Sequence, residues 1–190
     1  MRKLVQLRGT TGAGKTTCMR GFIERLGGAE LGYVNGSKAK RGVMRSEHWT
    51  ILGDYENQSA CTGCDRFSNR DDLMAVLKSV FRERPENIAF EGMVYSHTFQ
   101  LASDVNELAR KHGYEYVPVF LNTSYETALA RVTVRNGGKK INEEALVSKI
   151  LAFRVAREKI RRSGIKIVDI DSDSLSAEQV ADRFFEVATR

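Results

Sequence analysis

One short segment of the sequence has the residue types and spacing needed to hold a nucleotide phosphate. Residues 9–16 read G-T-T-G-A-G-K-T and fill the pattern G-x-x-x-x-G-K-[ST] without a gap. The glycines let backbone N–H groups point inward at the start of a helix, whose dipole favours anions. Lys15 is able to reach the β- and γ-phosphates, and the Thr16 hydroxyl is placed to hold Mg²⁺. We expect the nucleotide to contact the whole loop, namely Gly9, Thr11, Gly12, Ala13, Gly14, Lys15, Thr16 and Thr17.

The residues on either side of this loop provide the context that the motif requires. An apolar run, Leu4–Leu7, precedes it, and a helical stretch, Cys18–Leu26, follows it. A strand, a loop and a helix in this order make a chance match rare. The additional glycine, Gly12, gives the form G-x-x-G-x-G-K-T, which resembles the loops of small-molecule and nucleotide kinases. The chain has neither an N-K-x-D motif nor an apolar strand ending in Asp-Glu, so it resembles nucleoside-monophosphate kinases more than GTPases or motor ATPases.

Length and composition are typical of one α/β domain that covers residues 1–190. The chain has 190 residues, is 42% hydrophobic and contains only two prolines, which favours a substantial core without a linker. No apolar stretch reaches membrane-spanning length, and the N-terminus leads directly into a strand, so we expect neither a signal peptide nor a membrane partner. Three cysteines are too few for a disulfide framework, which favours the cytoplasm.

Positive charge is unevenly distributed along the chain. The net charge is +6, and residues 131–166 contain eleven Lys or Arg but only three acids. A second run, residues 38–45, contains Lys38, Lys40, Arg41 and Arg45 and no acid. Arg41 is a candidate substrate-binding residue. One interpretation of the charge is a solvated face with the phosphate-neutralising lid that any such kinase carries. The other is a polyanionic acceptor, DNA in particular.

The order of apolar runs and helical patterns predicts a P-loop kinase fold. Short strands alternate with amphipathic helices, which indicates a parallel sheet of about five strands flanked by helices. The turn signal Asn35-Gly36 predicts an inserted hairpin between residues 32–34 and 49–52, with the basic stretch as its connection. Ser124, Asn142 and Ser176 are placed to begin helices.

Two arginines lie four residues apart on one predicted helix. Arg131 and Arg135 share a helix face and are followed by Gly137-Gly138, a possible hinge. This arrangement resembles the lid of nucleotide kinases, whose arginines close over the phosphates at the transition state. We therefore expect a helical lid over about residues 131–142 and a catalytic role for both arginines.

Two carboxylates follow predicted strands and are candidates for positioning the acceptor hydroxyl. Asp54 comes two residues after Leu52, and Glu91 directly follows Phe90. Ligands of parallel α/β sheets bind at these strand ends, where phosphoryl transfer needs a carboxylate to orient the hydroxyl and take its proton. Residues 91–96 resemble the Asp-Arg-Tyr position of thymidylate kinases, with Glu91 in place of Asp and glycine in place of Arg. Which of Asp54 and Glu91 is the base stays open, and Glu91 is also a candidate for holding magnesium-bound water.

A Gly- and Cys-rich loop contains further candidate substrate ligands. Asp65 and Arg66 offer an acceptor and a bidentate donor, which suit a base edge or a phosphate. Cys61 and Cys64 have C-x-x-C spacing, but zinc needs four ligands and the sequence has no second pair. We interpret this segment as a tight loop shaped around substrate rather than a metal site.

These features resemble a narrower group, the phage-encoded P-loop kinases related to thymidylate kinase, some of which phosphorylate 5-hydroxymethyluracil within DNA. The resemblance lies in Gly53-Asp-Tyr55, in Cys61-x-Gly-Cys-Asp65 and in the basic charge. It implies ATP and Mg²⁺, a DNA acceptor, a flipped base and activity in the host cytoplasm, with Lys15, Arg131 and Arg135 neutralising the developing charge. Two alternatives stay open: a kinase of a free deoxynucleoside monophosphate or other small metabolite, and a non-catalytic nucleotide-binding switch.

Overall fold

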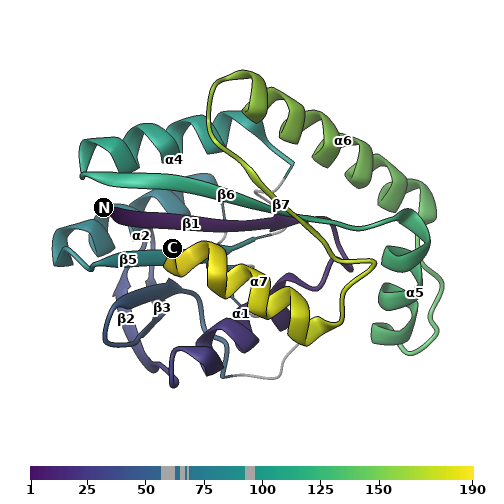
Figure 1. The fold of residues 1–190 in the computed structure, drawn as a ribbon, viewed down its shortest axis with the longest axis horizontal. Helices are drawn as coiled ribbons and strands as arrows, with labels where there is room; N and C mark the ends of the chain where they lie inside the picture. The colour runs from purple at the N-terminus through teal and green to yellow at the C-terminus, as the bar shows by residue number, and fades with distance from the viewer. Residues whose placement is uncertain (57–62, 65–66, 68, 93–96) are drawn as a thin grey trace.

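The computed structural model describes residues 1–190 except 57–62, 65–66, 68 and 93–96, and Figure 1 shows its fold. Its strands, as far as the chain is described, are β1 (Arg2–Gly9), β2 (Glu30–Asn35), β3 (Lys40–Arg45), β4 (Trp49–Leu52), β5 (Asn87–Glu91), β6 (Tyr114–Asn122) and β7 (Val168–Asp171). Its helices in the same residues are α1 (Lys15–Arg25), α2 (Arg70–Glu83), α4 (Phe99–Lys111), α5 (Tyr125–Arg135), α6 (Glu143–Arg162) and α7 (Ala177–Thr189).

Five of the described strands run parallel to one another. The order across the sheet is β2-β3-β4-β5-β1-β6-β7, and the parallel part extends from β4 to β7. Each parallel connection needs a crossover, and a helix placed there covers one face of the sheet. The prediction of a parallel sheet of about five strands flanked by helices is confirmed. All five strands end at the same edge, which lies to the right in Figure 1.

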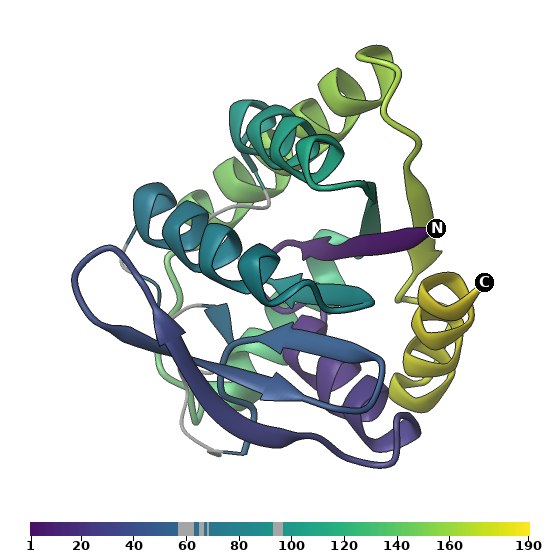
Figure 2. The ribbon, with the colours of Figure 1, turned by 90° about the vertical axis from the view of Figure 1, so that its left-hand side faces the viewer.

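Helices cover both faces of the sheet and divide the core into two layers. On one face α1 and α7 lie side by side, and Phe22 packs edge-on against Phe184 with ring centroids 5.1 Å apart. On the other face α2, α4 and α6 cover strand residues such as Phe90 and Phe120 (Figures 1 and 2). Strand β1 contributes residues to both layers, so its carboxyl end is buried from two sides.

Three helix starts carry the capping side chains that the sequence predicts. The Ser124 hydroxyl accepts a hydrogen bond from the backbone N–H of Thr127, and the Asn142 side chain accepts one from Ala145. Ser176 and Gln179 form a reciprocal capping box at α7. These bonds satisfy backbone donors that a helix leaves unpaired at its N-terminus, so they fix where α5, α6 and α7 begin.

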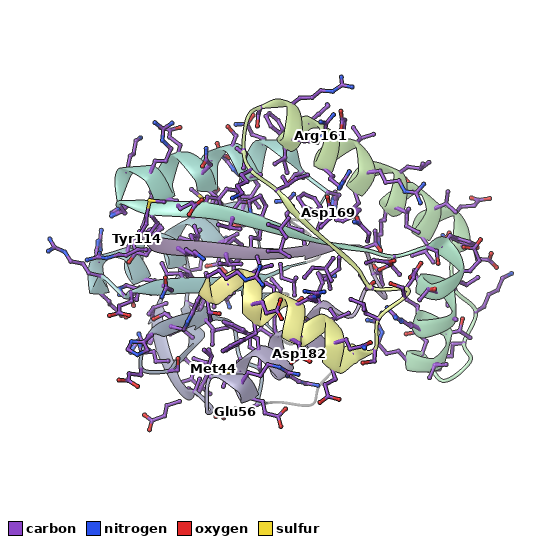
Figure 3. The ribbon with its side chains drawn as sticks, viewed as in Figure 1. Met44, Glu56, Tyr114, Arg161, Asp169 and Asp182 are labelled. Carbon is purple, nitrogen blue, oxygen red and sulfur yellow. The ribbon has the colours of Figure 1, made fainter. Side chains whose placement is uncertain are left out.

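A hairpin is present, but its strands differ from those predicted. The basic stretch expected as a connection forms β3, which pairs antiparallel with β2 on one side and with β4 on the other. The hairpin therefore extends the sheet at its edge, and β4 belongs to the parallel part. Val43 and Met44 are buried within this basic run, which is what makes it a strand (Met44 is labelled in Figure 3).

Arg41 of β3 is held by a buried carboxylate on α2. Its Nε lies 2.6 Å from Oδ2 of Asp72, whose side chain is 0% exposed. Oδ1 of Asp72 accepts hydrogen bonds from N and Oγ of Ser37 at the hairpin tip, at 2.8 and 3.0 Å. A buried carboxylate needs such pairing to offset its loss of hydration. This cluster fixes the hairpin to α2, so Arg41, expected to bind substrate, is engaged in a structural ion pair.

The segment predicted as a lid, about residues 131–142, comprises the end of α5 and the α5–α6 connection. Helix α5 ends at Arg135, and residues 136–142 turn the chain into α6 through Gly137 and Gly138.

Across the described residues, no helix combines the length and the apolar character needed to span a membrane.

Candidate active site

The phosphate loop occupies residues 9–16, between the central strand β1 and helix α1. Gly12 has a φ of 82°, which side chains rarely adopt, and a Cβ there would lie 2.7 Å from the carbonyl oxygen of Ala128 in α5. Only glycine fits this position, because both the backbone conformation and the space exclude a side chain. The loop is therefore packed directly against the first turns of α5.

Lys15 lies within the concave side of this loop. Its side chain is largely buried, with the residue 7% exposed, and Nζ donates a hydrogen bond to the carbonyl oxygen of Thr10 at 2.9 Å. The ammonium group is thus held where the backbone N–H groups at the start of α1 also concentrate positive potential. A phosphate placed in the loop meets both sources of charge.

Glu91 makes the contact that joins the phosphate loop to the neighbouring strand. Oγ1 of Thr16 donates a hydrogen bond to Oε1 of Glu91 at 2.8 Å, and Glu91 is 2% exposed. The pairing of β1 with β5 sets Leu7 opposite Glu91, so the carboxylate lies at the start of α1. A hydroxyl and a carboxylate are oxygen ligands of the kind that Mg²⁺ prefers, so the residues present fit this metal.

Asp54, the competing carboxylate, lies after β4 and is half-buried. Its Oδ1 accepts a hydrogen bond from N of Glu56 at 3.1 Å, and its carbonyl oxygen accepts one from N of Gly63 at 3.0 Å. The bond from Gly63 closes a local turn formed by residues 53–55 and 63–64, which we call the β4 turn. The carboxylate that the structure ties to the phosphate loop through Thr16 is Glu91.

The β4 turn packs onto Glu91. A Cβ on Gly63 would lie 2.8 Å from the Tyr55 hydroxyl oxygen and 2.9 Å from Oε1 of Glu91. The buried thiol of Cys64 donates a hydrogen bond to the carbonyl oxygen of Leu52, which holds the turn against the end of β4. The carboxylate thus lies between the phosphate loop on one side and the β4 turn on the other.

Three of the predicted loop residues, Cys61, Asp65 and Arg66, lie outside the described residues. Within those that are described, no group of three or more His, Cys, Asp or Glu side chains is arranged to hold a metal ion. The interpretation of this segment as a loop shaped around substrate stays a prediction.

Arg131 reaches the phosphate loop from α5. Its Nη2 donates a hydrogen bond to the carbonyl oxygen of Ser172 at 2.8 Å, and Nη1 donates one to that of Gly12 at 3.4 Å. Arg135, one turn further along, is exposed, and its side chain makes no hydrogen bond or ion pair to any described residue. The structure therefore brings Arg131, but not Arg135, to the loop.

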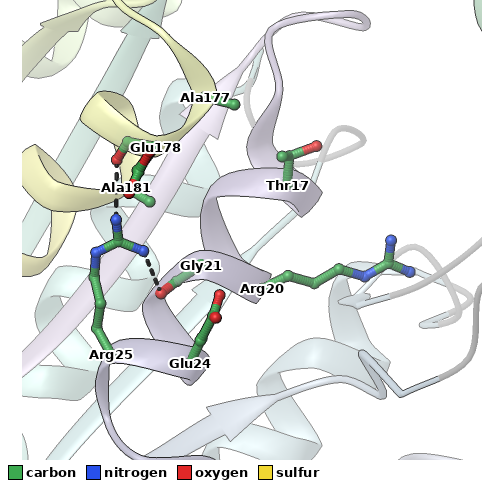
Figure 4. A pocket seen from close by; sticks show the side chains of 8 residues that line it. All are labelled: Thr17, Arg20, Gly21, Glu24, Arg25, Ala177, Glu178 and Ala181. Carbon is green, nitrogen blue, oxygen red and sulfur yellow. Dashed lines mark hydrogen bonds between the residues drawn. The ribbon is translucent and has the colours of Figure 1, made fainter.

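A small cavity formed by described residues adjoins both the first turn of α1 and the phosphate loop. It measures about 140 Å³ and is lined by Ala13, Gly14, Arg131, Ser172 and Leu175 among others. A larger groove of about 610 Å³ runs between α1 and α7 (Figure 4). Arg25 spans this groove and donates to the carbonyl oxygens of Gly21 and Glu178. Lys15 and Glu91 do not line the groove, so we do not assign the chemistry to it.

Arg8 is a component of the site that the sequence patterns did not identify. It is 0% exposed, and its guanidinium donates to Oε1 of Gln6 and to the carbonyl oxygen of Thr98, both at 2.9 Å. Tyr116 also donates to Oε1 of Gln6. Burial lowers the pKa of Arg8, and the adjacent Tyr116 opposes that shift. Arg8 thereby ties the last residues of β1 to the start of α4. In the sequence, the signal that could have identified Arg8 is an arginine at the end of an otherwise apolar strand.

The fold and this site define a class of protein, the P-loop kinases, which are phosphotransferases. One solved structure with the same fold is YorR from Bacillus subtilis in complex with phosphorylated GDP. The TM-score is 0.59 at 15% identity, and the match covers 97% of this chain and 95% of that one.

The chain belongs to the 5-hmdU DNA kinase family, whose model matches residues 2–181. It is 26% identical over 183 residues to the 5-hmdU DNA kinase of Pseudomonas phage PaMx11, covering 90% of this chain and 92% of that protein. It is 27% identical over 187 residues to the 5-hmdU DNA kinase of Bacillus phage SP10. That match covers 96% of this chain but 29% of the SP10 protein, which is much longer.

Substitution of Gly63 tests the packing of the β4 turn on Glu91. Gly63→Ala and the control Gly164→Ala both place a side chain at positive φ, 63° and 82°, but Gly164 has no atom within 4 Å of its Cβ position. We expect the control to lose about 1 kcal/mol of unfolding free energy through backbone strain. Gly63→Ala should lose about 1–3 kcal/mol more through overpacking, and it alone should lower phosphoryl transfer. Equal losses, measured by chemical denaturation, would show that the turn does not press on Glu91.

Proposed function

We propose that this protein transfers the γ-phosphoryl group of ATP, with Mg²⁺, to the hydroxymethyl oxygen of 5-hydroxymethyluracil in DNA. The observation that carries the proposal is the hydrogen bond from Thr16 to the buried carboxylate of Glu91, because it sets an acidic group between a phosphate loop and the β4 turn. Membership of the 5-hmdU DNA kinase family supports DNA as the acceptor. The named relatives come from bacteriophages, which supports a phage enzyme acting in the host cytoplasm.

In this proposal the nucleotide binds along the loop formed by residues 9–17. The triphosphate takes the place inside the loop that the Lys15 ammonium faces, and Thr16 together with Glu91 provides oxygens for the metal. The metal, when bound, supplies neutralisation of phosphate charge. The cavity beside Ala13, Arg131 and Leu175 is the natural position for the base, because it opens from the same turn of α1.

The transfer itself needs one proton acceptor and several positive charges. The hydroxymethyl O–H loses its proton to a carboxylate, its oxygen forms a bond to the γ-phosphorus, and the bond from that phosphorus to the β–γ bridging oxygen breaks to release ADP. We propose Glu91 as the group that orients this hydroxyl, either directly or through metal-bound water, and Asp54 as the competing base. Lys15 and Arg131 neutralise the charge that develops on the phosphoryl group.

Lid closure brings the second arginine into the site in this proposal. Arg131 already bonds to the loop at Gly12 and stays there. Arg135, one turn further on the same face of α5, reaches the phosphates through a change of the last turn of α5 at the 137–138 hinge. Asp65 and Arg66 are proposed to contact the acceptor base. The ion pair of Arg41 with Asp72 weighs against a direct substrate contact for Arg41.

Removal of the loop lysine tests the kinase chemistry. Lys15→Ala should abolish phosphoryl transfer, because Lys15 brings the mobile positive charge of the loop to the transferring group. Lys111→Ala is the matched control, since Lys111 is exposed at the end of α4 and pairs with Glu107. Both variants should retain the thermal unfolding midpoint of the parent. Undiminished turnover in a well-folded Lys15→Ala protein would remove the kinase proposal.

A pair of isosteric substitutions ranks the two carboxylates. Glu91→Gln should lower turnover by at least about a hundredfold with little change in ATP affinity, because orientation and proton acceptance act mainly in the transition state. Asp54→Asn should have the smaller effect, since the carboxylate that Thr16 of the phosphate loop contacts is that of Glu91. Steady-state kinetics and ATP titration measure both. An inactive Asp54→Asn protein beside a fully active Glu91→Gln protein would reverse the ranking.

The acceptor is tested with γ-labelled ATP and a panel of hydroxymethylated duplex DNA, unmodified DNA and free nucleotides. We expect label on the hydroxymethylated DNA alone. DNA affinity should also fall steeply between low and physiological salt, with a log–log slope of about −0.9 for each phosphate contacted. A kinase of a free nucleotide would show only the small salt effect of one or two ion pairs. Label transferred to a free monophosphate and to no polymer would identify the protein as a small-molecule kinase.

A further inference from the structure

Several basic residues of the hairpin and of α6 are engaged in ion pairs within the protein. Arg45 pairs with Glu83, and Arg157 pairs with Asp169. Arg161 and Arg162 both bond to Glu158, whose carboxyl pKa they lower to about 2. A charge already paired gains less from a DNA phosphate, because the new contact must replace the old one. The hairpin and the C-terminal half of α6 are therefore weaker candidates for DNA contact than their charge alone suggests.

The turn between α5 and α6 differs from these regions because its basic side chains are not engaged in ion pairs with described residues. Residues 131–142 contain four Lys or Arg and no acid. The side chains of Arg135, Lys139 and Lys140 are exposed and make no hydrogen bond or ion pair with the residues that the structure describes. We call residues 134–140 the lid tip. Its positive charge is available to an external anion. Its two glycines allow the backbone to change conformation when an anion binds.

One apolar side chain projects from this basic surface. Val134 is 82% exposed, and it lies three residues after Arg131, on a neighbouring position of the same helix surface. Val132, by contrast, is 5% exposed and faces Gly12 of the phosphate loop. An isolated exposed valine is ordinary on a protein surface. Here it lies about one helical turn beyond the arginine that bonds to the loop.

The topology sets the lid tip beside the entrance to the site. The β4 turn follows β4, and α5 follows β6, so the two rise from the carboxyl edge of the sheet on opposite sides of β1 and the phosphate loop (Figure 1). A base that reaches Glu91 must enter from this edge. The duplex that carries such a base then lies across the elements at this edge, where the lid tip presents exposed basic side chains.

We propose that the lid tip binds duplex DNA at the flipped nucleotide, with Lys139 and Lys140 on backbone phosphates and Val134 inserted next to the base step that flipping opens. The inference rests on the proposed function, because it requires a base within a duplex as acceptor. Flipping breaks stacking, and proteins that distort DNA commonly place an apolar side chain against the exposed base faces. The neighbouring lysines supply the phosphate contacts that such an insertion needs.

The phosphate contacts are tested with two double variants that remove the same charge. Lys139→Gln with Lys140→Gln should reduce the steepness of the log–log salt dependence of DNA binding by about 1.8, or about 0.9 for each phosphate that is no longer neutralised. Arg161→Gln with Arg162→Gln should leave the slope unchanged, since those arginines are paired with Glu158. Binding is measured on duplex DNA that carries one 5-hydroxymethyldeoxyuridine. Equal slopes in the two double variants would overturn the proposal.

The insertion of Val134 is tested with 2-aminopurine next to the modified base. Parent protein should raise the fluorescence of this reporter as the step unstacks, and Val134→Ser should lose most of that rise. On duplex substrate kcat/KM of Val134→Ser should fall at least about tenfold, with little change on the same sequence as a single strand. Val147→Ser, at another exposed valine, is the control and should match the parent. A Val134→Ser protein with parental fluorescence and the parental duplex preference would overturn the insertion.

The same substrates separate failure of this inference from failure of the proposed function. If the parent transfers no phosphate to any DNA, the proposed function is wrong and the inference fails with it. If the parent phosphorylates the DNA while all lid-tip variants behave as it does, only the inference is wrong. Circular dichroism and thermal unfolding of each variant should match the parent, because every substituted side chain is exposed.

Discussion

The hydrogen bond between Thr16 and Glu91 is the contact on which the geometry of the site depends. It joins the first turn of α1 to the end of β5, and the register of β1 with β5 fixes both ends. Glu91 is almost fully buried, so its charge needs polar partners at this position. The β4 turn closes the other side through Gly63, where a side chain would collide with the carboxylate. The phosphate loop, the carboxylate and the β4 turn are therefore packed together as one unit.

Different contacts hold the phosphate loop and the start of α4 in place around this unit. The loop side is rigid, because Gly12 packs on α5 and Arg131 bonds to both Gly12 and Ser172. Thr98, at the start of α4, is held by the buried guanidinium of Arg8. A buried arginine is costly unless it is hydrogen-bonded, and the bonds of Arg8 to Gln6 and Thr98 give it a positioning role beside the phosphate loop. Catalysis by positioning, which phosphoryl transfer requires, matches such a framework.

The sequence predicted what local chemistry determines and missed what depends on distant partners. The phosphate loop, the parallel strands and the caps at Asn142 and Ser176 follow from short patterns, because each depends on neighbours in the chain. The sequence analysis did not predict a strand at residues 40–45, because these residues are mostly charged and only two side chains of β3 are buried apolar ones. The partner of Arg41 was not predictable either, because Asp72 lies 31 residues away and meets it only after α2 packs on the hairpin. The proposed catalytic roles of Lys15, Asp54, Glu91, Arg131 and Arg135 stay predictions.

The most direct measurement of the central claim is the identity of the phosphorylated nucleotide. Duplex DNA with one 5-hydroxymethyldeoxyuridine is incubated with the protein, ATP and Mg²⁺, digested to single nucleotides and analysed by mass spectrometry. We predict that the modified nucleotide gains one phosphoryl group on its 5-hydroxymethyl oxygen while thymidine in the same strand gains none. Phosphate found only at a strand terminus, or only on a free nucleotide, would contradict the account.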